Sequence, residues 1–153
     1  MLNIGDMAPA FTIPTDTGEF SLAEHSGKNI VIFFFPKADT SGCTKEAIAF
    51  SGLSAEFEAA NAVVIGISKD TPQKQAKFRE KHQLDCLLGA DHETDICETF
   101  GVWQEKSMYG RKYMGIQRAT FLIGANGTLT HIWPKVKIPG HAEDVLDHVR
   151  AGG

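Results

Sequence analysis

The chain has 153 residues, 42% of them hydrophobic and 22% charged, which is the composition of a globular protein that buries its own core. Fifteen Lys and Arg against nineteen Asp and Glu give a net charge of −4, so a basic stripe for nucleic acid or anionic lipid is not expected. The longest apolar run, Ile30 to Phe35, is far shorter than the roughly 20 residues of a membrane-spanning helix.

The N-terminus and the cysteines predict a cytoplasmic protein. The first residues, MLNIGDMAPAF, show no basic segment followed by an apolar stretch, which is the pattern of an export signal. The three cysteines are an odd number and widely spaced, which is not the pattern of a secreted disulfide framework.

The first half of the chain alternates between strand and helix patterns. Continuous apolar runs predict buried strands, and apolar residues at three- and four-residue steps predict amphipathic helices. Thr15–Gly18 has turn chemistry, and Asp70-Thr71-Pro72 supplies an N-cap followed by a proline at the first helical position. The predicted elements are a hairpin of residues 11–13 and 20–22, a strand 29–35, a helix 42–60, a strand 63–68 and a helix 72–82.

The second half contains shorter elements. Residues 102–115 are polar and punctuated by glycine, which predicts a long loop of the functional or mobile kind. The other predicted elements are a strand 86–90, a helix 93–100 ended by Gly101, a hairpin of 118–123 and 128–133, and a helix 141–149. Because parallel crossovers precede a late hairpin, the order predicts an α/β fold with a mixed sheet flanked by helices. No repeat or linker interrupts it, so we expect a single domain over residues 1–153.

Cys43 is the first candidate for chemistry. It follows the apolar strand 29–35 and lies in the first turn of the predicted helix, where the positive end of the helix favours a thiolate over a thiol. A thiolate is a nucleophile. A free cysteine at this position can equally be a small buried hydrophobic residue, and the position alone leaves both interpretations open.

The pattern Pro36-x-x-x-Thr40-x-x-Cys43 after an apolar strand resembles the active-site motif of the peroxiredoxins. The resemblance covers nearly the whole chain and is specific to the branch called bacterioferritin comigratory protein, or peroxiredoxin Q. Gly5-Asp6-x-Ala8-Pro9-x-Phe11 and Ile65–Asp70 resemble the opening and the second strand of the family, and Phe100–Lys106 and Gly115–Ile123 resemble segments of this branch.

This resemblance implies a thioredoxin-like mixed β-sheet flanked by helices, with an N-terminal hairpin extension. It also implies a thiol peroxidase that reduces hydrogen peroxide and organic hydroperoxides without a cofactor. Cys43 would be the peroxidatic cysteine, Thr40 its hydrogen-bonding neighbour, Pro36 the shield of the pocket and Arg118 the active-site arginine. Without the resemblance, Arg118 would be interpreted as a surface arginine at a strand start.

The sequence departs from the pattern at the resolving cysteine, the thiol that reacts with the oxidised peroxidatic residue. Many relatives of this branch carry it five residues after the peroxidatic cysteine, where this chain has Ile48, and others at a position that we align with Arg79. Cys86 and Cys97 remain, and their apolar neighbours predict that both are core residues. The leading hypothesis is therefore a one-cysteine mechanism in a monomer. Glutathione or a thioredoxin- or glutaredoxin-type protein would reduce Cys43.

Several alternatives stay open. Cys86 or Cys97 could act as a resolver, or the chain could be a non-catalytic thioredoxin-like binding or holdase module. A thiol–disulfide oxidoreductase is disfavoured because Glu46 stands where a CxxC pair would have its second thiol. Glu46 and Lys45 could shape the field at the sulfur or lie on a solvated helix face. The six histidines lack metal-ligand spacing, and no nucleotide-binding glycine motif is present.

Overall fold

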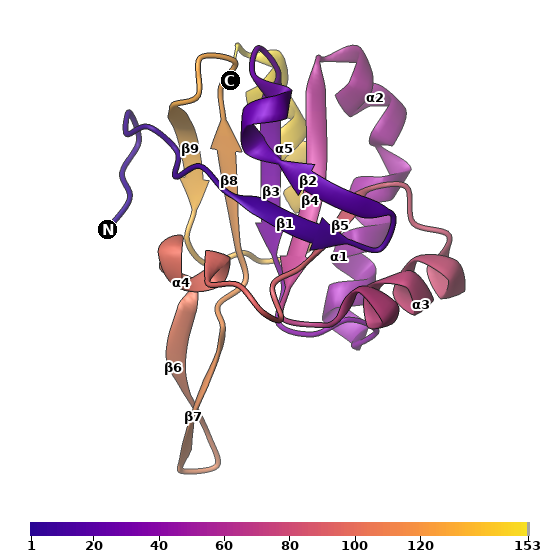
Figure 1. Ribbon diagram of the computed structural model, residues 1–153, viewed down its shortest axis with the longest axis vertical. Helices are drawn as coiled ribbons and strands as arrows, with labels where there is room; N and C mark the ends of the chain where they lie inside the picture. The colour runs from indigo at the N-terminus through magenta and orange to yellow at the C-terminus, as the bar shows by residue number, and fades with distance from the viewer. Residues whose placement is uncertain (153) are drawn as a thin grey trace.

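The structure is a computed structural model that describes residues 1–152 (Figure 1). Its centre is a seven-stranded sheet in the order β2-β1-β5-β4-β3-β8-β9, and β6 and β7 form a separate two-stranded ribbon. The strands are β1 (Thr12–Thr15), β2 (Gly18–Ser21), β3 (Asn29–Phe34), β4 (Ala62–Ser68), β5 (Leu87–Ala90), β6 (Trp103–Met108), β7 (Arg111–Ile116), β8 (Ala119–Ile123) and β9 (Leu129–Trp133). The α-helices are α1 (Ser41–Gly52), α2 (Ser54–Ala59), α3 (Pro72–His82), α4 (Ile96–Thr99) and α5 (His141–Arg150), with a 3-10 turn at Leu22–His25. No helix in the described residues is long and apolar enough to cross a membrane.

The sheet is mixed, as predicted. β3, β4 and β5 are parallel neighbours, whereas β8 runs antiparallel to β3 and β9 antiparallel to β8. The early strands β1 and β2 form the predicted N-terminal hairpin, which joins the sheet through an antiparallel contact with β5. This is the thioredoxin-like α/β architecture with an N-terminal extension.

Alternate residues of β3 face two different halves of the core. Val31 and Phe33 pack under α1, α2, α3 and α5, and Ile32 and Phe34 pack on the other face with α4 and the N-terminal hairpin. Because successive side chains of a strand point to opposite faces, a strand covered on both sides must be apolar throughout. This explains the continuous apolar run at residues 29–35.

Two predicted helices were wrong in extent, whereas the predicted strands begin and end within two residues of the observed ones. The helix predicted over 42–60 divides into α1 and α2 at Leu53, whose backbone (φ −105°, ψ 13°) leaves the helical range directly after the weak helix former Gly52. The helix predicted over 93–100 is a single turn at Ile96–Thr99. The strand predicted from Cys86 begins at Leu87.

The loop predicted over 102–115 is instead the hairpin of β6 and β7, which projects from the body (Figure 1). Its strands pair with each other from Trp103–Ile116 to Met108–Arg111. Tyr109 (φ 51°) and Gly110 (φ 78°) form a two-residue turn in which both residues have positive φ, the geometry that matches the twist of a hairpin. Because most of both strands is exposed, the apolar alternation that usually signals a strand is missing. The turn sequence Tyr109-Gly110 was the one local feature that could have indicated the hairpin.

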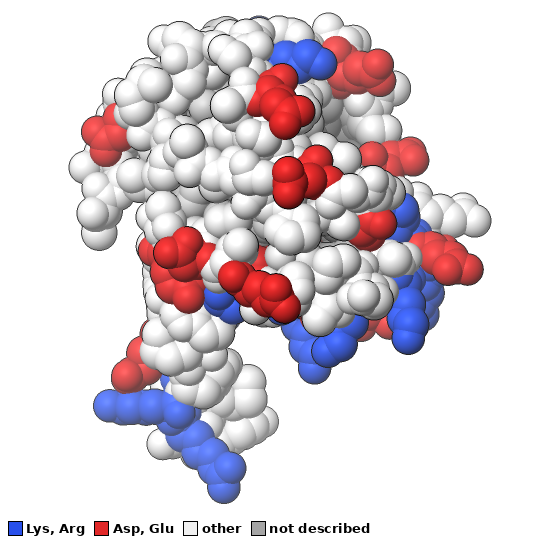
Figure 2. Space-filling model, in the orientation of Figure 1, with Lys and Arg blue, Asp and Glu red and all other residues white. Residues whose placement is uncertain are grey.

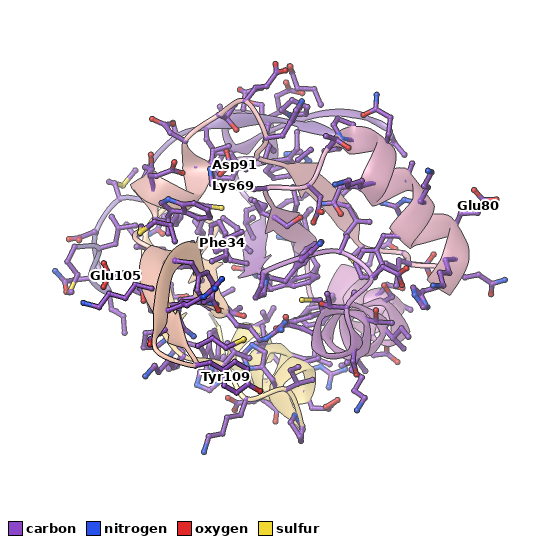
Figure 3. All side chains as sticks on the ribbon, turned by 90° about the horizontal axis from the view of Figure 1, so that it is seen from below. Phe34, Lys69, Glu80, Asp91, Glu105 and Tyr109 are labelled. Carbon is purple, nitrogen blue, oxygen red and sulfur yellow. The ribbon has the colours of Figure 1, made fainter. Side chains whose placement is uncertain are left out.

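The strand directions bring four segments to one end of the sheet. The parallel strands β3 and β4 both end there, and the antiparallel register of β8 and β9 places the start of β8 and the end of β9 beside them. Viewed onto this end, Phe34 of β3 lies centrally, with Glu105 of the β6–β7 hairpin on the left, Tyr109 at the hairpin turn below it, and Glu80 of α3 on the right (Figure 3).

Candidate active site

Cys43 lies at this end of the sheet, where the chain leaves β3 and begins α1. It is the third residue of α1, and its side chain is 1% exposed. Cys43, Glu46, Ala47 and Phe50 form the buried face of the helix. Cys43 therefore lies in the first turn of α1, at the positive end of the helix dipole.

The loop before Cys43 is held by contacts with segments distant in the sequence. The backbone N–H of Ala38 donates to Asp70 Oδ2 at 2.7 Å, directly after β4. Asp39, in the left-handed conformation (φ 62°), pairs with Lys81 Nζ at 2.9 Å and with His82 Nε2 at 2.8 Å. These contacts fix the start of α1 against α3, so the position of Cys43 depends on both helices.

Thr40 and Pro36 lie on the exposed side of this loop. Thr40 has the extended backbone of an N-cap residue, but its side chain makes no capping bond; its hydroxyl donates to the carbonyl of Lys37 at 2.8 Å. Within residues 1–152, Thr40 and Cys43 share no hydrogen bond. The first-turn N–H groups of α1 thus lack a side-chain cap, and the Thr40 oxygen keeps lone pairs for an incoming donor.

Arg118, between β7 and β8, reaches the sulfur. Its Nη2 donates to Cys43 Sγ at 3.3 Å, and its Nη1 donates to Glu46 Oε1 at 2.7 Å. The side chain is 16% exposed, so the interpretation as a surface arginine was wrong. Burial opposes its charge, but Glu46 and Cys43 outweigh that effect and raise the pKa of Arg118. The guanidinium is a permanent cation held against the sulfur.

Glu46 is a site residue that sequence reasoning weighed without deciding. It is 1% exposed rather than on a solvated face, and burial raises its pKa to about 7 although Arg118 acts in the opposite direction. The available signal was its spacing, because residues i and i+3 lie on the same face of a helix. Lys45 is exposed, as a solvated face requires.

Lys106 on β6 is a residue near the sulfur that the sequence did not indicate. Its side chain is half-buried and packs across Gly115, where a β-carbon would lie 3.3 Å from Lys106 Cδ. Burial and the charge of Arg118 lower the pKa of Lys106, and the charge of Cys43 acts on it in the opposite sense. The register of the β6–β7 hairpin brings this second cation toward the sulfur, and nothing in the local sequence indicated it.

Cys86 and Cys97 are buried free thiols, as predicted for core residues. Cys86 Sγ accepts a hydrogen bond from Ser51 Oγ at 3.6 Å, and Ser51 lies eight residues after Cys43, about 12 Å along α1. Cys97 packs on the opposite face of the sheet. Burial raises the pKa of Cys86 to about 11, and burial with a hydrogen bond to Asp91 raises that of Cys97 as well.

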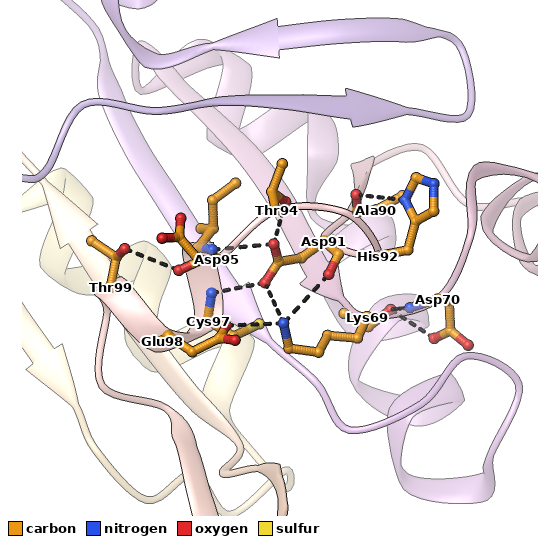
Figure 4. A network of polar contacts seen from close by, with 12 residues as sticks. Lys69, Asp70, Ala90, Asp91, His92, Thr94, Asp95, Cys97, Glu98 and Thr99 are labelled. Carbon is orange, nitrogen blue, oxygen red and sulfur yellow. Dashed lines mark hydrogen bonds and ion pairs between the residues drawn. The ribbon is translucent and has the colours of Figure 1, made fainter.

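The surroundings of Cys97 form a polar network that holds α4 (Figure 4). Asp91, which is fully buried, accepts from the Thr94 hydroxyl and from the N–H groups of Ile96 and Cys97, at 3.1 and 2.8 Å. Burial opposes its charge, but these hydrogen bonds lower the pKa of Asp91. Lys69 Nζ pairs with Asp91 and lies over the Trp103 ring, 5.0 Å from its centroid, so the network also supports the base of β6.

Comparisons with known proteins identify the family. The AhpC/TSA family model matches residues 4–132. A putative Bcp peroxiredoxin of Coxiella burnetii is 43% identical over 95% of this chain and 97% of its own length. The crystal structure of a PrxQ cysteine-to-serine mutant from Xylella fastidiosa superposes with a TM-score of 0.90 at 34% identity, covering 99% of this chain and 97% of that one.

A further solved structure is a bacterioferritin comigratory protein of Xanthomonas campestris, described for its alkyl peroxide reduction activity. It has a TM-score of 0.87 and 36% identity, and the match covers 92% of this chain and 90% of that one. The similarity in sequence and fold extends over almost the full length of this chain and of each of these relatives. This chain therefore belongs to the AhpC/TSA family, in its Bcp or peroxiredoxin Q branch, and is a thiol-dependent peroxidase.

Proposed function

We propose that this peroxidase reduces hydrogen peroxide and organic hydroperoxides at Cys43 by a one-cysteine mechanism, as a monomer in the cytoplasm. The observation that carries the proposal is the contact of Arg118 Nη2 with Cys43 Sγ at 3.3 Å, in a chain whose other two thiols lie elsewhere in the core. Three free, widely spaced cysteines suit a reducing compartment.

The reaction follows from the groups around the sulfur. The Cys43 thiolate attacks the terminal peroxide oxygen, an S–O bond forms, the O–O bond breaks, and the electron pair leaves on the departing oxygen as hydroxide or alkoxide. Donors aimed at that oxygen lower the barrier because charge develops there in the transition state. Arg118 and the uncapped first-turn N–H groups of α1 supply them, while Thr40 accepts the peroxide O–H and Pro36 covers the pocket.

The product is a sulfenic acid on Cys43, and no thiol in the described part of the chain is placed to resolve it. A disulfide needs Cα atoms about 4.4–6.8 Å apart, whereas Cys86 lies near the far end of α1 and Cys97 across the sheet. Ile48 and Arg79 occupy the positions at which relatives carry their resolver. Ile48 is 47% exposed, and Arg79 is paired with Asp16. An external thiol therefore completes the cycle.

The charge at this end of the protein favours an anionic reductant. Contrary to the expectation from net charge, basic residues concentrate here: segments 36–45, 72–82, 102–118 and 134–140 hold 12 of the 15 Lys and Arg and 3 of the 19 Asp and Glu. Figure 2 shows the basic side chains along this edge and acidic ones over the body. An acidic thioredoxin- or glutaredoxin-type protein, or glutathione, would be steered toward Cys43.

Mass spectrometry under non-reducing conditions, after one equivalent of peroxide, tests the mechanism. The expected product is a dimedone-trapped sulfenic acid on Cys43, formed equally in the variant Cys86→Ser/Cys97→Ser. A Cys43–Cys86 or Cys43–Cys97 bridge as the main product would establish a two-cysteine mechanism instead. Equal peroxide consumption by wild type and Cys43→Ser would leave only a non-catalytic module, and light scattering after size exclusion reports the oligomeric state.

The dependence of the reduction rate on ionic strength tests whether charge steers the reductant toward Cys43. Reduction of the Cys43 sulfenic acid by an acidic thioredoxin should slow as salt rises and in Lys74→Glu/Lys77→Glu, whereas reduction by uncharged dithiothreitol should not change. Lys28→Glu, at the opposite end of β3, is the matched control. A rate independent of salt and of both substitutions would contradict electrostatic steering.

A further inference from the structure

One guanidinium serves two groups that can each become an anion. Arg118 binds Cys43 Sγ through Nη2 at 3.3 Å and Glu46 Oε1 through Nη1 at 2.7 Å. Cys43 and Glu46 are separated by less than one turn on the buried face of α1, and each side chain is 1% exposed. Two anions in so dry a site face a single permanent positive charge.

The second oxygen of Glu46 is the most unusual atom of the site. Oε2 is buried and has no hydrogen-bond partner among residues 1–152. An ionised carboxylate distributes its charge over both oxygens, so a bare Oε2 leaves half of that charge without solvation, which is costly in a protein interior. Burial accordingly raises the pKa of Glu46 to about 7, against the opposing effect of Arg118.

The other charged or titratable groups around the site do not stabilise an ionised Glu46. Lys106 of β6 acts on Cys43 and Arg118, and its own pKa is lowered by burial. His141 at the start of α5 is neutral at physiological pH, because burial lowers its pKa to about 4. Arg118 is the only cation among the described residues that lowers the pKa of Glu46.

We infer that Cys43 and Glu46 share one proton under Arg118: when Cys43 is a thiolate, Glu46 holds the proton, and when the sulfur loses its charge, Glu46 becomes the anion. The site then carries one negative charge opposite Arg118 in every state, which is the arrangement that a single guanidinium can neutralise. This inference rests on the proposed reaction at Cys43 and adds Glu46 to it.

The proton has a defined place in the reaction. The thiolate attacks the peroxide, the S–O bond forms and the O–O bond breaks, and the departing hydroxide or alkoxide takes the proton held by Glu46 to leave as water or alcohol. Cys43 is then a neutral sulfenic acid, and the Glu46 carboxylate takes the full charge of Arg118. One external thiol condenses with the sulfenic acid to give a mixed disulfide and water. A second external thiol then displaces the Cys43 thiolate by forming a disulfide with the first, and the proton that it releases returns to Glu46.

Infrared difference spectroscopy tests this proton transfer from Glu46 directly. At neutral pH, oxidation of reduced wild type by one equivalent of peroxide should remove the carbonyl stretch of one protonated carboxyl group. The loss should be absent in Glu46→Gln, which has no carboxyl at this position, and in Cys43→Ser, which is not oxidised. Glu58→Gln, an exposed acid on α2, is the matched control and should give the wild-type signal.

The outcomes separate the two proposals. If wild type forms the Cys43 sulfenic acid without any change in the carboxyl band, or if the change persists in Glu46→Gln, the shared proton is overturned and the peroxidase mechanism stands. If dimedone traps no sulfenic acid on Cys43, the proposed function itself fails.

The pH profile is a second readout that general damage to the site would not reproduce. In wild type, the rate of the reaction with peroxide should fall as the pH rises through about 7, because Glu46 then loses the proton that the leaving group takes. Glu46→Gln keeps an oxygen for Arg118 but has no such proton, so its reaction with peroxide should be about 10²-fold slower at neutral pH and should not show this fall. Glu46→Asp should recover part of the rate. A Glu46→Gln thiolate that reacts as fast as wild type would overturn the inference.

Discussion

Gly42 lies directly against Arg118, and the absence of a side chain at this position leaves room for the guanidinium. A β-carbon built on Gly42 would lie 3.2 Å from Arg118 Nη2 and 3.3 Å from Ile138 Cδ1. Nη2 is the atom that donates to Cys43 Sγ. The residue before the nucleophile therefore determines how closely the cation can approach.

Gly42→Ala should separate stability from activity. Alanine in the first turn favours the helix, so unfolding should change little, whereas the displaced Arg118 should lower kcat/KM for peroxide by about tenfold or more. Peroxide consumption with dithiothreitol measures the effect. Gly52→Ala is the matched control in the same helix, since a β-carbon there meets no atom within 4 Å, and it should stabilise by up to about 1 kcal/mol with normal activity. Normal activity of Gly42→Ala would contradict the packing argument.

Arg118→Lys should be a severe change despite its retained charge. Arg118 contacts Cys43 and Glu46 through two different nitrogens, and the single ammonium of lysine cannot reproduce that fork. We expect a loss of about 10²–10³-fold in kcat/KM, the scale seen when a donor to a developing oxyanion is removed. Arg150→Lys, on the exposed end of α5, is the control. A loss below about threefold would show that charge alone is sufficient.

Arg79→Ala should destabilise the fold without affecting the chemistry of the sulfur. Arg79 Nε pairs with Asp16 at 2.5 Å, and the Asp16 side chain is 2% exposed. The same guanidinium donates to the carbonyls of Leu84 and Cys86 at 2.6 and 2.8 Å. Removing one partner of a buried pair costs about 3–5 kcal/mol, visible as a lower urea midpoint. Lys77→Ala on the exposed face of α3 should fall within about 0.5 kcal/mol of wild type, and equal losses in the two variants would be evidence against the structural role of Arg79.

His141 should make the protein sensitive to acid. Burial lowers its pKa from 6.5 to about 4, so the folded state binds this proton more weakly than the unfolded state. The stability is therefore fully present above pH 6.5 and decreases as the pH falls toward 4, by about 3 kcal/mol in total. His141→Gln cannot gain the charge and retains a polar partner for Thr120, which lies 2.8 Å from His141 Nε2. Denaturation series at several pH values should show that the free energy of unfolding decreases less at acid pH in the variant than in wild type. An equal decrease in both proteins would refute the role of His141.

The sequence determined the elements whose signal is local. The apolar run of β3, the Thr71-Pro72 start of α3 and the late hairpin around residues 124–127 were all predicted within a few residues, because burial on both faces, capping and turn chemistry act over short distances. Local signals of this kind also indicated the nucleophile at the start of α1. Arg118 was indicated as its partner only by the resemblance to the peroxiredoxins.

Only the tertiary structure decided which groups meet around the sulfur. Arg118 is 75 residues from Cys43 in the chain, and the β8 register beside β3 brings them together. The approach of Lys106 on an exposed hairpin and the concentration of basic side chains at one end likewise depend on how distant segments pack. Contacts of this kind leave no periodic trace in the sequence, because their energy comes from desolvation and charge between residues that become neighbours only when the chain has folded.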